Sequence, residues 1–213
     1  MGKVLVACEE SQAVTIELRK LGHEAYSCDL KPCSGGHPEW HLQQDVSILL
    51  KEKWDMIIAH PPCTFLTNGG AVRMYHPKGV VDKKRLAKAM EAKEFFMLFY
   101  NADCEKIVIE NPMPLTIVNL PTKTQVIQPF EYGDAYSKKT YLWIKGLPNL
   151  EPTKILTSYQ PFINGGGGRK EKQNYKGKTF ANGSEKRSKT FPGIAKAMAE
   201  QWGRLLSKEE VLN

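Results

Sequence analysis

The chain has 213 residues, which is enough for one well-packed core and too few for two full domains. Hydrophobic residues make up 41% and charged residues 25%, an ordinary globular composition that argues against global disorder. A mean hydropathy of -0.41, without any long apolar run, argues against a membrane-spanning helix, and a net charge of +7 suits a polyanionic partner without identifying one.

Five cysteines lie at scattered positions. The N-terminal sequence MGKVLVACEES lacks the basic, apolar and small-residue order of a signal peptide. Without such a signal, an odd number of cysteines favours reduced thiols. The sequence therefore predicts a cytoplasmic protein that does not contact membranes, and no obligate protein partner is evident in it.

The first two-thirds of the chain alternates strand and helix signals. Compact apolar runs predict buried strands, and apolar residues three or four positions apart predict helices. This alternation implies a mostly parallel sheet with helices on both faces. In chain order we expect a strand at 4–8, a helix at 11–21, a strand at 24–29, a poorly marked strand ending at 45–46, a strand at 54–60, a helix at 82–101 and a strand at 106–110.

The pattern changes after residue 110. Two strand-like runs, at 124–132 and 139–145, have no helix between them and should pair as an antiparallel hairpin. Residues 193–206 return to helical spacing and close the fold. Residues 164–190 are rich in glycine and lysine and have little to fill a core, so we interpret them as a mobile basic loop. The sequence thus predicts an α/β fold in a single domain spanning 1–213.

Acids and thiols follow the predicted strands, where open α/β sheets bind their ligands. Asp29 closes the second strand, where an acid often holds ribose hydroxyls; a turn or capping aspartate is the alternative. The loop after the first strand has no glycine, so a dinucleotide pyrophosphate has no cradle, whereas S-adenosylmethionine is compatible. The candidate cofactor-binding residues are Cys8, Glu9, Glu10, Ser11, Asp29, Asp45 and Pro61.

Cys63 follows two prolines directly after a buried strand, so its thiol should be held at the edge of the sheet. It fits a nucleophile, and the alternative is a small buried hydrophobe, the usual fate of a lone cysteine. Glu110 ends the next strand. Because adjacent parallel strands end side by side, the thiol and the carboxylate should flank one pocket, which favours catalysis over packing.

Four motifs, in order, resemble those of DNA cytosine-C5 methyltransferases. The segments HPPCT at 60–64 and IENP at 109–112 resemble their Pro-Cys and Glu-Asn-Val motifs. The Tyr-Gly pair at 132–133 followed by KKTYLWIKG, and FPGIA at 191–195, are similar to their Tyr-Gly...Arg-x-Arg-x-strand and closing motifs. Nearly the full chain also resembles the compact DNA methylases often encoded by phages and prophages.

This resemblance implies a Rossmann-like fold that uses S-adenosylmethionine to methylate C5 of cytosine in DNA. It implies that Cys63 attacks C6 of the base and that Glu110 hydrogen-bonds N3 and the exocyclic amine. The candidate contacts to the substrate are Pro62, Asn111, Lys138, Lys139, Arg169 and Lys170.

The chain departs from the family in three places. Glu9-Glu10-Ser11 replace the glycine-bearing first loop, lysines replace arginines before the final strand, and only the basic segment 164–190 stands where a target-recognition domain is expected. Three alternatives stay open: a nucleic-acid-binding module with a vestigial pocket, a methyltransferase that acts on RNA or uses a modified S-adenosylmethionine, and a small-molecule methyltransferase, which the positive charge disfavours.

Cys28, Cys33, His37 and His41 have side chains of the kinds that bind zinc. Cys28 belongs to a predicted strand, and this spacing without a paired CxxC is a weak signal, so we assign no metal site. Trp40, inside the same segment, is interpreted as a packing residue, with adenine stacking as the alternative.

Overall fold

The structure is a computed structural model that describes residues 1–67, 73–162 and 189–206. Within these ranges, seven strands form one sheet in the order β3-β2-β1-β4-β5-β8-β6. The first five strands in sequence are parallel, β8 is antiparallel to β5, and β6 is antiparallel to β8. The strands are β1 (Lys3–Ala7), β2 (Glu24–Asp29), β3 (His41–Gln43), β4 (Met56–Ala59), β5 (Ile107–Pro112), β6 (Gln125–Ile127) and β8 (Thr140–Lys145).

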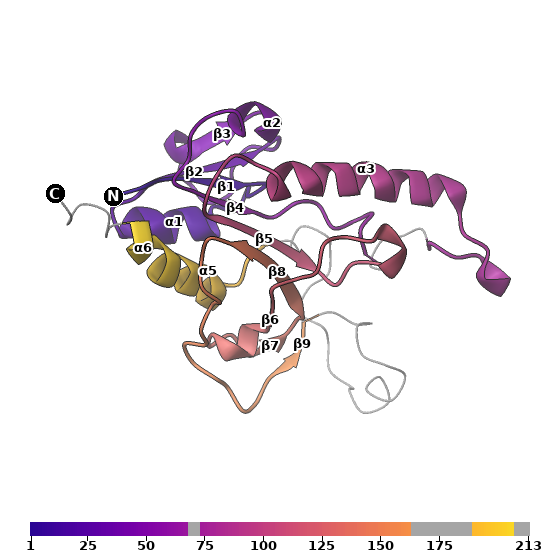
Figure 1. Cartoon of the computed structure of the whole chain (residues 1–213). Coiled ribbons are helices and arrows are strands. Elements are labelled where there is room, and N and C mark those ends of the chain that lie inside the picture. The colour runs from indigo at the N-terminus through magenta and orange to yellow at the C-terminus, as the bar shows by residue number, and fades with distance from the viewer. Residues whose placement is uncertain (68–72, 163–188, 207–213) are drawn as a thin grey trace.

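Helices cover both faces of this sheet (Figure 1). Helices α1 (Ala13–Lys20) and α5 (Pro192–Met198) pack on one face, and α3 (Lys83–Tyr100) packs on the other. The remaining elements are α2 (Val46–Leu49), α6 (Arg204–Leu206), the π-helical turn Ala199–Gly203 that joins α5 to α6, the 3-10 turns η1 (Pro38–Trp40), η2 (Pro77–Gly79), η3 (Thr116–Val118) and η4 (Pro129–Glu131), and the short parallel pair β7 (Tyr136–Ser137) and β9 (Gln160–Pro161).

Alternate residues of the central strands point to opposite faces, which divides the core into two clusters. Val4 and Val6 of β1 pack with residues of α1 and α5. Leu5 and Ala7 pack in the cluster that contains Phe96 of α3. Both faces of the central strands are buried, which explains why their sequences are continuous apolar runs.

The predicted fold class is confirmed. The sheet is mostly parallel, and its last two strands, β6 and β8, pair antiparallel as expected. They are not joined by a tight turn, since η4 and β7 lie between them in the sequence. The third strand ends at Gln43, and Asp45 instead begins α2, where its carboxylate accepts a hydrogen bond from the Ser47 N–H.

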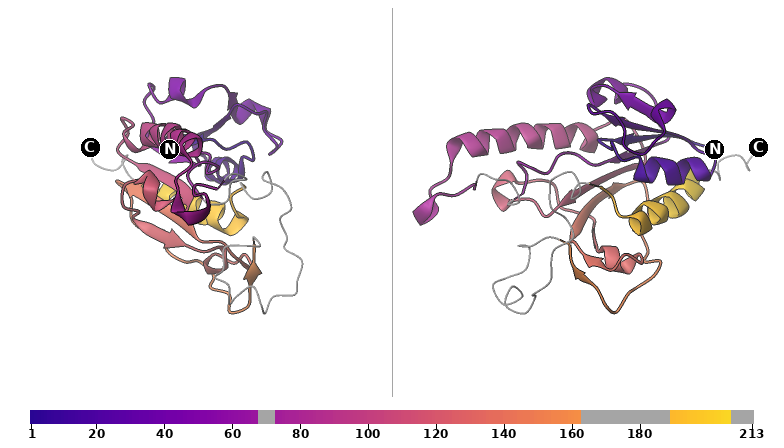
Figure 2. Two further views of the ribbon diagram at one scale, coloured as in Figure 1. Left: turned by 90° about the vertical axis from the view of Figure 1, so that its right-hand side faces the viewer. Right: turned by 180° about the vertical axis from the view of Figure 1, so that it is seen from behind.

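Helix α3 extends beyond the edge of the sheet, with η2 at its outer end (Figure 2). Asp82 begins this helix by accepting a hydrogen bond from the N–H of Arg85. No helix in the described ranges combines the length and the apolar character needed to cross a membrane. Nearly all of the predicted basic loop, including Arg169 and Lys170, lies outside the described residues.

Candidate active site

The loop after β4 is tied to the end of β5 at two successive residues. The imidazole Nδ1 of His60 lies 3.2 Å from Glu110 Oε2, and the amide of Asn111 donates a 2.8 Å hydrogen bond to the carbonyl of Pro61. The His60 N–H also donates to the carbonyl of Ala7 at 2.9 Å, which joins this loop to β1. The loop that carries Cys63 therefore has a fixed start beside Glu110.

Cys63 begins a tight turn at the carboxyl edge of the sheet. Its carbonyl accepts hydrogen bonds from the N–H groups of Leu66 and Thr67, both at 3.1 Å, and from the Thr67 hydroxyl. The side chain of Cys63 is partly exposed, whereas Leu66 is fully buried and anchors the turn in the core. The backbone of this partly exposed cysteine is therefore held in place.

The side chain of Arg85, on α3, is hydrogen-bonded to the backbone of the same turn. Its side chain is only 3% exposed, and its guanidinium donates to the carbonyls of Thr64, Phe65 and Thr67 at 3.2, 2.7 and 3.1 Å. The rigid fork of donors on arginine suits this set of carbonyls, and the single ammonium of a lysine does not.

We expect Arg85→Lys to lower the free energy of unfolding by about 3 kcal/mol, since hydrogen bonds made by a charged donor are worth about 1.5–3 kcal/mol each. Denaturant unfolding measures this change. Lys88→Ala is the matched control on the same helix, because the Lys88 side chain lies over the Phe65 ring and is exposed. Equal stability of the Arg85 variant and the wild type would contradict this role.

The side chain of Glu110 is 14% exposed and lies near His60 and Lys138. Burial alone raises the pKa of Glu110, but the hydrogen bond from His60 and the positive charge of Lys138 outweigh it. The pKa of Glu110 therefore lies below its ordinary value, and the carboxyl group is ionised at neutral pH in the free protein.

Glu9 is buried and serves the N-terminus of α1. Its carboxylate accepts hydrogen bonds from Val14 N at 2.7 Å, Thr15 N at 3.3 Å and Thr15 Oγ1 at 2.8 Å. Burial raises the pKa of Glu9, against the lowering by the nearby charge of His60 and by these hydrogen bonds. An acidic side chain thus occupies the place where phosphate-binding folds hold an anion.

Two residues in the loop between β1 and α1 adopt a left-handed backbone conformation that is usual for glycine, although the loop contains no glycine. Cys8 and Gln12 have φ values of 59° and 58°, in the left-handed region that side chains disfavour by about 1–2 kcal/mol. A Cβ on Gly35 would lie 2.6 Å from the Ser11 carbonyl oxygen and from Gln12 Cβ, so glycine permits the loop after β2 to approach this closely. The two loops therefore pack against each other.

The other candidate cofactor residues occupy the carboxyl edge formed by β1, β2 and β4. Asp29 is half-buried at the end of β2, and its Oδ1 accepts from Lys31 N at 3.0 Å. Glu10 Oε1 lies 3.8 Å from the Lys189 ammonium, which also donates to Ser34 Oγ. Strand β1 alone separates β2 from β4, so Asp29 and Pro61 lie two strands apart and not on opposite edges.

Of the candidate substrate contacts, Pro62 and Lys139 are exposed and Asn111 is buried. The Lys138 ammonium lies 5.9 Å from the centre of the Phe162 ring and 5.8 Å from that of Phe191, while its charge acts on Glu110. The two lysines before β8 therefore have different surroundings, since Lys138 lies near the Glu110 carboxylate and Lys139 faces solvent.

The four residues with zinc-type side chains do not gather. Within the described ranges, no group of three or more potential ligands forms a metal site. Cys28 donates to the Gln44 carbonyl, and His41 Nε2 lies 2.9 Å from the Lys31 carbonyl. Burial raises the pKa of Cys28 to about 11, which disfavours the thiolate that zinc requires. The five cysteines, all in the described part of the chain, form no disulfide.

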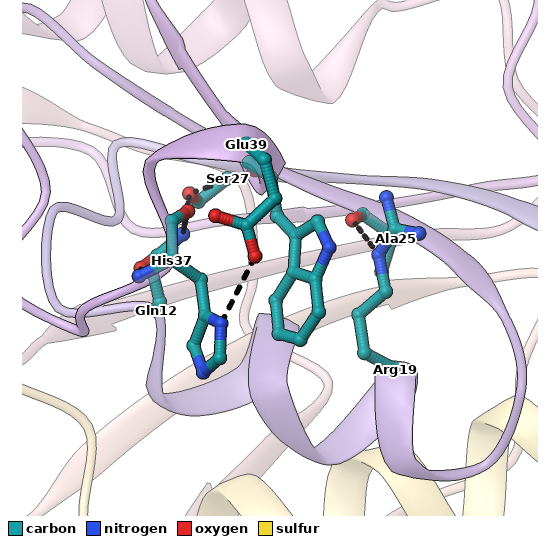
Figure 3. A network of polar contacts seen from close by, with 7 residues as sticks. Gln12, Arg19, Ala25, Ser27, His37 and Glu39 are labelled. Carbon is teal, nitrogen blue, oxygen red and sulfur yellow. Dashed lines mark hydrogen bonds and ion pairs between the residues drawn. The ribbon is translucent and has the colours of Figure 1, made fainter.

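Trp40 is engaged in packing. His37 stacks on it with ring centres 3.9 Å apart, and the Arg19 guanidinium lies 5.2 Å from the indole. Figure 3 shows this network, in which the Gln12 amide both donates to and accepts from the backbone of His37 and the carboxylate of Glu39 lies at the His37 ring. A hollow of about 420 Å³ beside these side chains is lined by α1 and η1, away from the Cys63 loop.

Three residues that build this site were not predicted from the sequence. His60 was visible only as the residue before two prolines, Arg85 as one of three basic residues at the start of α3, and Gln12 as a polar residue before α1. A histidine directly after a buried strand was the available signal for His60, because it stands at the ligand-binding edge. Nothing in the sequence distinguishes Arg85 from its exposed neighbours.

No family model matches the sequence, and no curated protein matches it. Solved structures do have folds similar to this one. One is a prophage-encoded protein from E. coli described as a DNA modification methyltransferase, with 16% identity, a TM-score of 0.43 and coverage of 72% of this chain and 51% of that one. Two more are DNMT2 proteins. A variant from Spodoptera frugiperda has 15% identity, a TM-score of 0.41 and coverage of 77% of this chain and 56% of that one. The S. pombe protein, described as a methyltransferase, has 12% identity, a TM-score of 0.39 and coverage of 70% of this chain and 50% of that one. The chain spans about half the length of these proteins.

Proposed function

We propose that this protein transfers a methyl group from S-adenosylmethionine to C5 of cytosine in DNA through a covalent adduct with Cys63. One observation carries the proposal. The loop that bears Cys63 is hydrogen-bonded at two successive residues to Glu110 and Asn111, so the thiol and the carboxylate belong to the same edge of the sheet. A nucleophile beside a proton-carrying group is the arrangement that this reaction requires.

The chemistry assigned to the two side chains is complementary. C5 of cytosine is a poor nucleophile, and attack of the Cys63 thiolate on C6 makes C5 electron-rich. Protonation at N3 by Glu110 stabilises the adduct, and the carboxyl group also accepts a hydrogen bond from the exocyclic amine. After C5 is methylated, loss of its hydrogen to a base allows the C6–S bond to break and frees Cys63.

The first loop fits a cofactor without phosphates. Because the Glu9 carboxyl group already accepts from the N–H groups that begin α1, those donors are not available to a pyrophosphate. Asp29, at the end of β2, has one carboxylate oxygen without a hydrogen bond to the described residues and suits ribose hydroxyls. Bound S-adenosylmethionine supplies the methyl group, and Asp29, Glu10 and Pro61 are the residues proposed to hold it.

DNA as the substrate is supported by charge. The net charge of +7 and the lysines at 138 and 139 favour a polyanion near Glu110. The target base must leave the stack to reach a thiol held at a sheet edge, which costs a few kcal/mol in a duplex. Phosphate contacts from the basic segment 164–190 are proposed to offset that cost.

The test is to incubate the protein with methyl-labelled S-adenosylmethionine and DNA, digest the DNA and identify the labelled nucleoside. The proposal requires label in 5-methyl-2′-deoxycytidine from the DNA. If only RNA were labelled, RNA and not DNA would be the substrate. If the label were on an amino group of a base, the C5 chemistry would be refuted. Calorimetry with S-adenosylmethionine completes the test, since a nucleic-acid-binding module with a vestigial pocket would bind DNA and no cofactor.

A further inference from the structure

His60 occupies the middle of a row of buried ionisable side chains. Strand β4 lies between β1 and β5, so the first residue after β4 has neighbours from both flanking strands. On one side is Glu110 of β5, at 3.2 Å from the imidazole. On the other is Glu9, which follows β1; burial raises its pKa, and the nearby charge of His60 opposes that rise. The side chain of His60 is 7% exposed, so it interacts with these groups at low screening.

The backbone and the neighbours fix the direction of this imidazole. The backbone N–H of His60 donates a hydrogen bond to the carbonyl of Ala7, and Pro61 and Pro62 restrict the backbone that follows. Because an ionised carboxylate only accepts, Nδ1 carries the hydrogen that His60 donates to Glu110. The opposite ring nitrogen, Nε2, is buried and has no hydrogen-bond partner among the described residues, as is also true of Asn111 Oδ1. Neither polar atom is explained by packing alone.

The proposed reaction needs a group that gives a proton to Glu110. Glu110 must give a proton to N3 of the base, yet in the free protein its carboxyl group is ionised. A second group has to supply that proton, and the donor must touch Glu110. His60 is in contact with it, and histidine is the side chain suited to exchange a proton near neutral pH.

We propose that His60 is the proton reserve and positioning residue for Glu110, a role that rests on the proposed function. As Cys63 bonds to C6, the Nδ1 proton of cationic His60 passes to the ionised Glu110 carboxylate at Oε2, and the carboxyl group gives a proton to N3. The N–H bond of His60 breaks as an O–H bond forms at Glu110, and that O–H bond breaks as N3 takes the proton, which leaves neutral imidazole and an ionised Glu110. When Cys63 leaves, N3 returns its proton by the reverse route. The charged groups that surround the pair are Glu9, from the loop after β1, and Lys138, from the segment before β8.

The test is the substitution His60→Asn. The asparagine amide keeps a donor near the position of Nδ1 and cannot titrate, so Glu110 stays oriented and loses its proton source. We expect kcat at pH 7.5 to fall about 100-fold, with the affinity for S-adenosylmethionine unchanged. The pH profile of kcat, scaled to its maximum, should also change form, since protonation of Glu110 no longer depends on His60 in the variant, whereas both proteins need the Cys63 thiolate. His60→Ala should regain activity when free imidazole is added.

His76→Asn is the matched control, because His76 is an exposed histidine that also contacts a carboxylate, that of Asp82 at 3.1 Å. Its pH profile should coincide with that of the wild type. If the profile of His60→Asn coincides with the wild type after scaling, and imidazole does not rescue His60→Ala, His60 only packs and the proposal is wrong.

A second readout separates this proposal from the proposed function. Carbon-13 NMR of the Glu110 carboxyl, assigned with Glu110→Gln, should show its pKa raised in His60→Asn, because a positive neighbour is lost. If the protein transfers methyl groups and this rise in the pKa of Glu110 is absent, only the role of His60 is overturned and the proposed function stands. The rise without any methyl transfer by the wild type would refute the proposed function and proton delivery together, and would leave only the contact between the two side chains.

Discussion

Cys63→Ser is expected to lose methyl transfer by a factor of about 1,000 or more, as removal of a catalytic nucleophile commonly does. A serine hydroxyl is a far weaker acid than a thiol, so it supplies almost no anion to attack C6. The variant should nevertheless fold, because the hydroxyl is close in size to the thiol and the turn at Cys63 is held by backbone bonds to Leu66 and Thr67. The free energy of unfolding should change by less than about 1 kcal/mol.

Cys104→Ser is the matched control for this result. Cys104 is also partly exposed, and its sulfur lies 3.3 Å from the carbonyl oxygens of both Trp54 and Lys106, so its one hydrogen has acceptors that a serine hydroxyl can also use. It lies just before β5, at the end of that strand opposite to Glu110. Single-turnover assays with labelled S-adenosylmethionine should find this variant as active as the wild type. Substantial activity in Cys63→Ser would mean that the cysteine only packs.

Glu110→Gln is expected to reduce kcat by a factor of about 100 to 10,000, the usual contribution of a general acid. The amide has the same shape and its oxygen still accepts from His60, so the loop after β4 should remain in place. The amide has no proton to give to N3, and the adduct at C6 loses its stabilisation. Because the pKa of Glu110 is lowered, the wild type depends on a second group for this proton, and the variant removes the final donor.

Steady-state kinetics and calorimetry together check the second prediction. The affinity for S-adenosylmethionine should be unchanged, since the proposed cofactor residues follow β1, β2 and β4 and not β5. Glu105→Gln is the control, because Glu105 is exposed and stands just before the start of the same strand. A fall in cofactor affinity equal to the fall in kcat would place Glu110 in the cofactor site instead.

The regular elements were predictable because their signals are local. The run EAYSCD gives β2 with the predicted bounds, and the predicted helix at 82–101 is α3 to within a residue at each end. The short elements were not predictable, because β3 and the β7–β9 pair have two or three residues each and depend on partners distant in sequence. Asp45 was assigned to a strand end because its role as a helix cap depends on a helix of only four residues.

The candidate site was predictable in its placement and not in its contacts. Strand alternation puts Cys63 and Glu110 on adjacent strand ends, which requires only the parallel order of β4 and β5. Three contacts depend on the tertiary structure: Glu9 accepts hydrogen bonds from the start of α1, Arg85 donates to the Cys63 turn, and His60 contacts Glu110. An acid in a loop, a base on a helix and a histidine at a strand end each have several structural uses, and only packing selects one.

The most direct measurement of the central claim uses DNA that contains 5-fluorocytosine. Fluorine at C5 leaves no hydrogen to remove after methylation, so the enzyme cannot release Cys63 from C6. With S-adenosylmethionine, the wild type should form an adduct that survives denaturation, and mass spectrometry of the digest should find the modified base on the peptide that contains Cys63. Cys63→Ser should form none. An adduct on Cys8 or Cys33 would retain the chemistry and refute its placement, and methylation of ordinary cytosine with no adduct on the fluorinated base would contradict covalent catalysis by this protein.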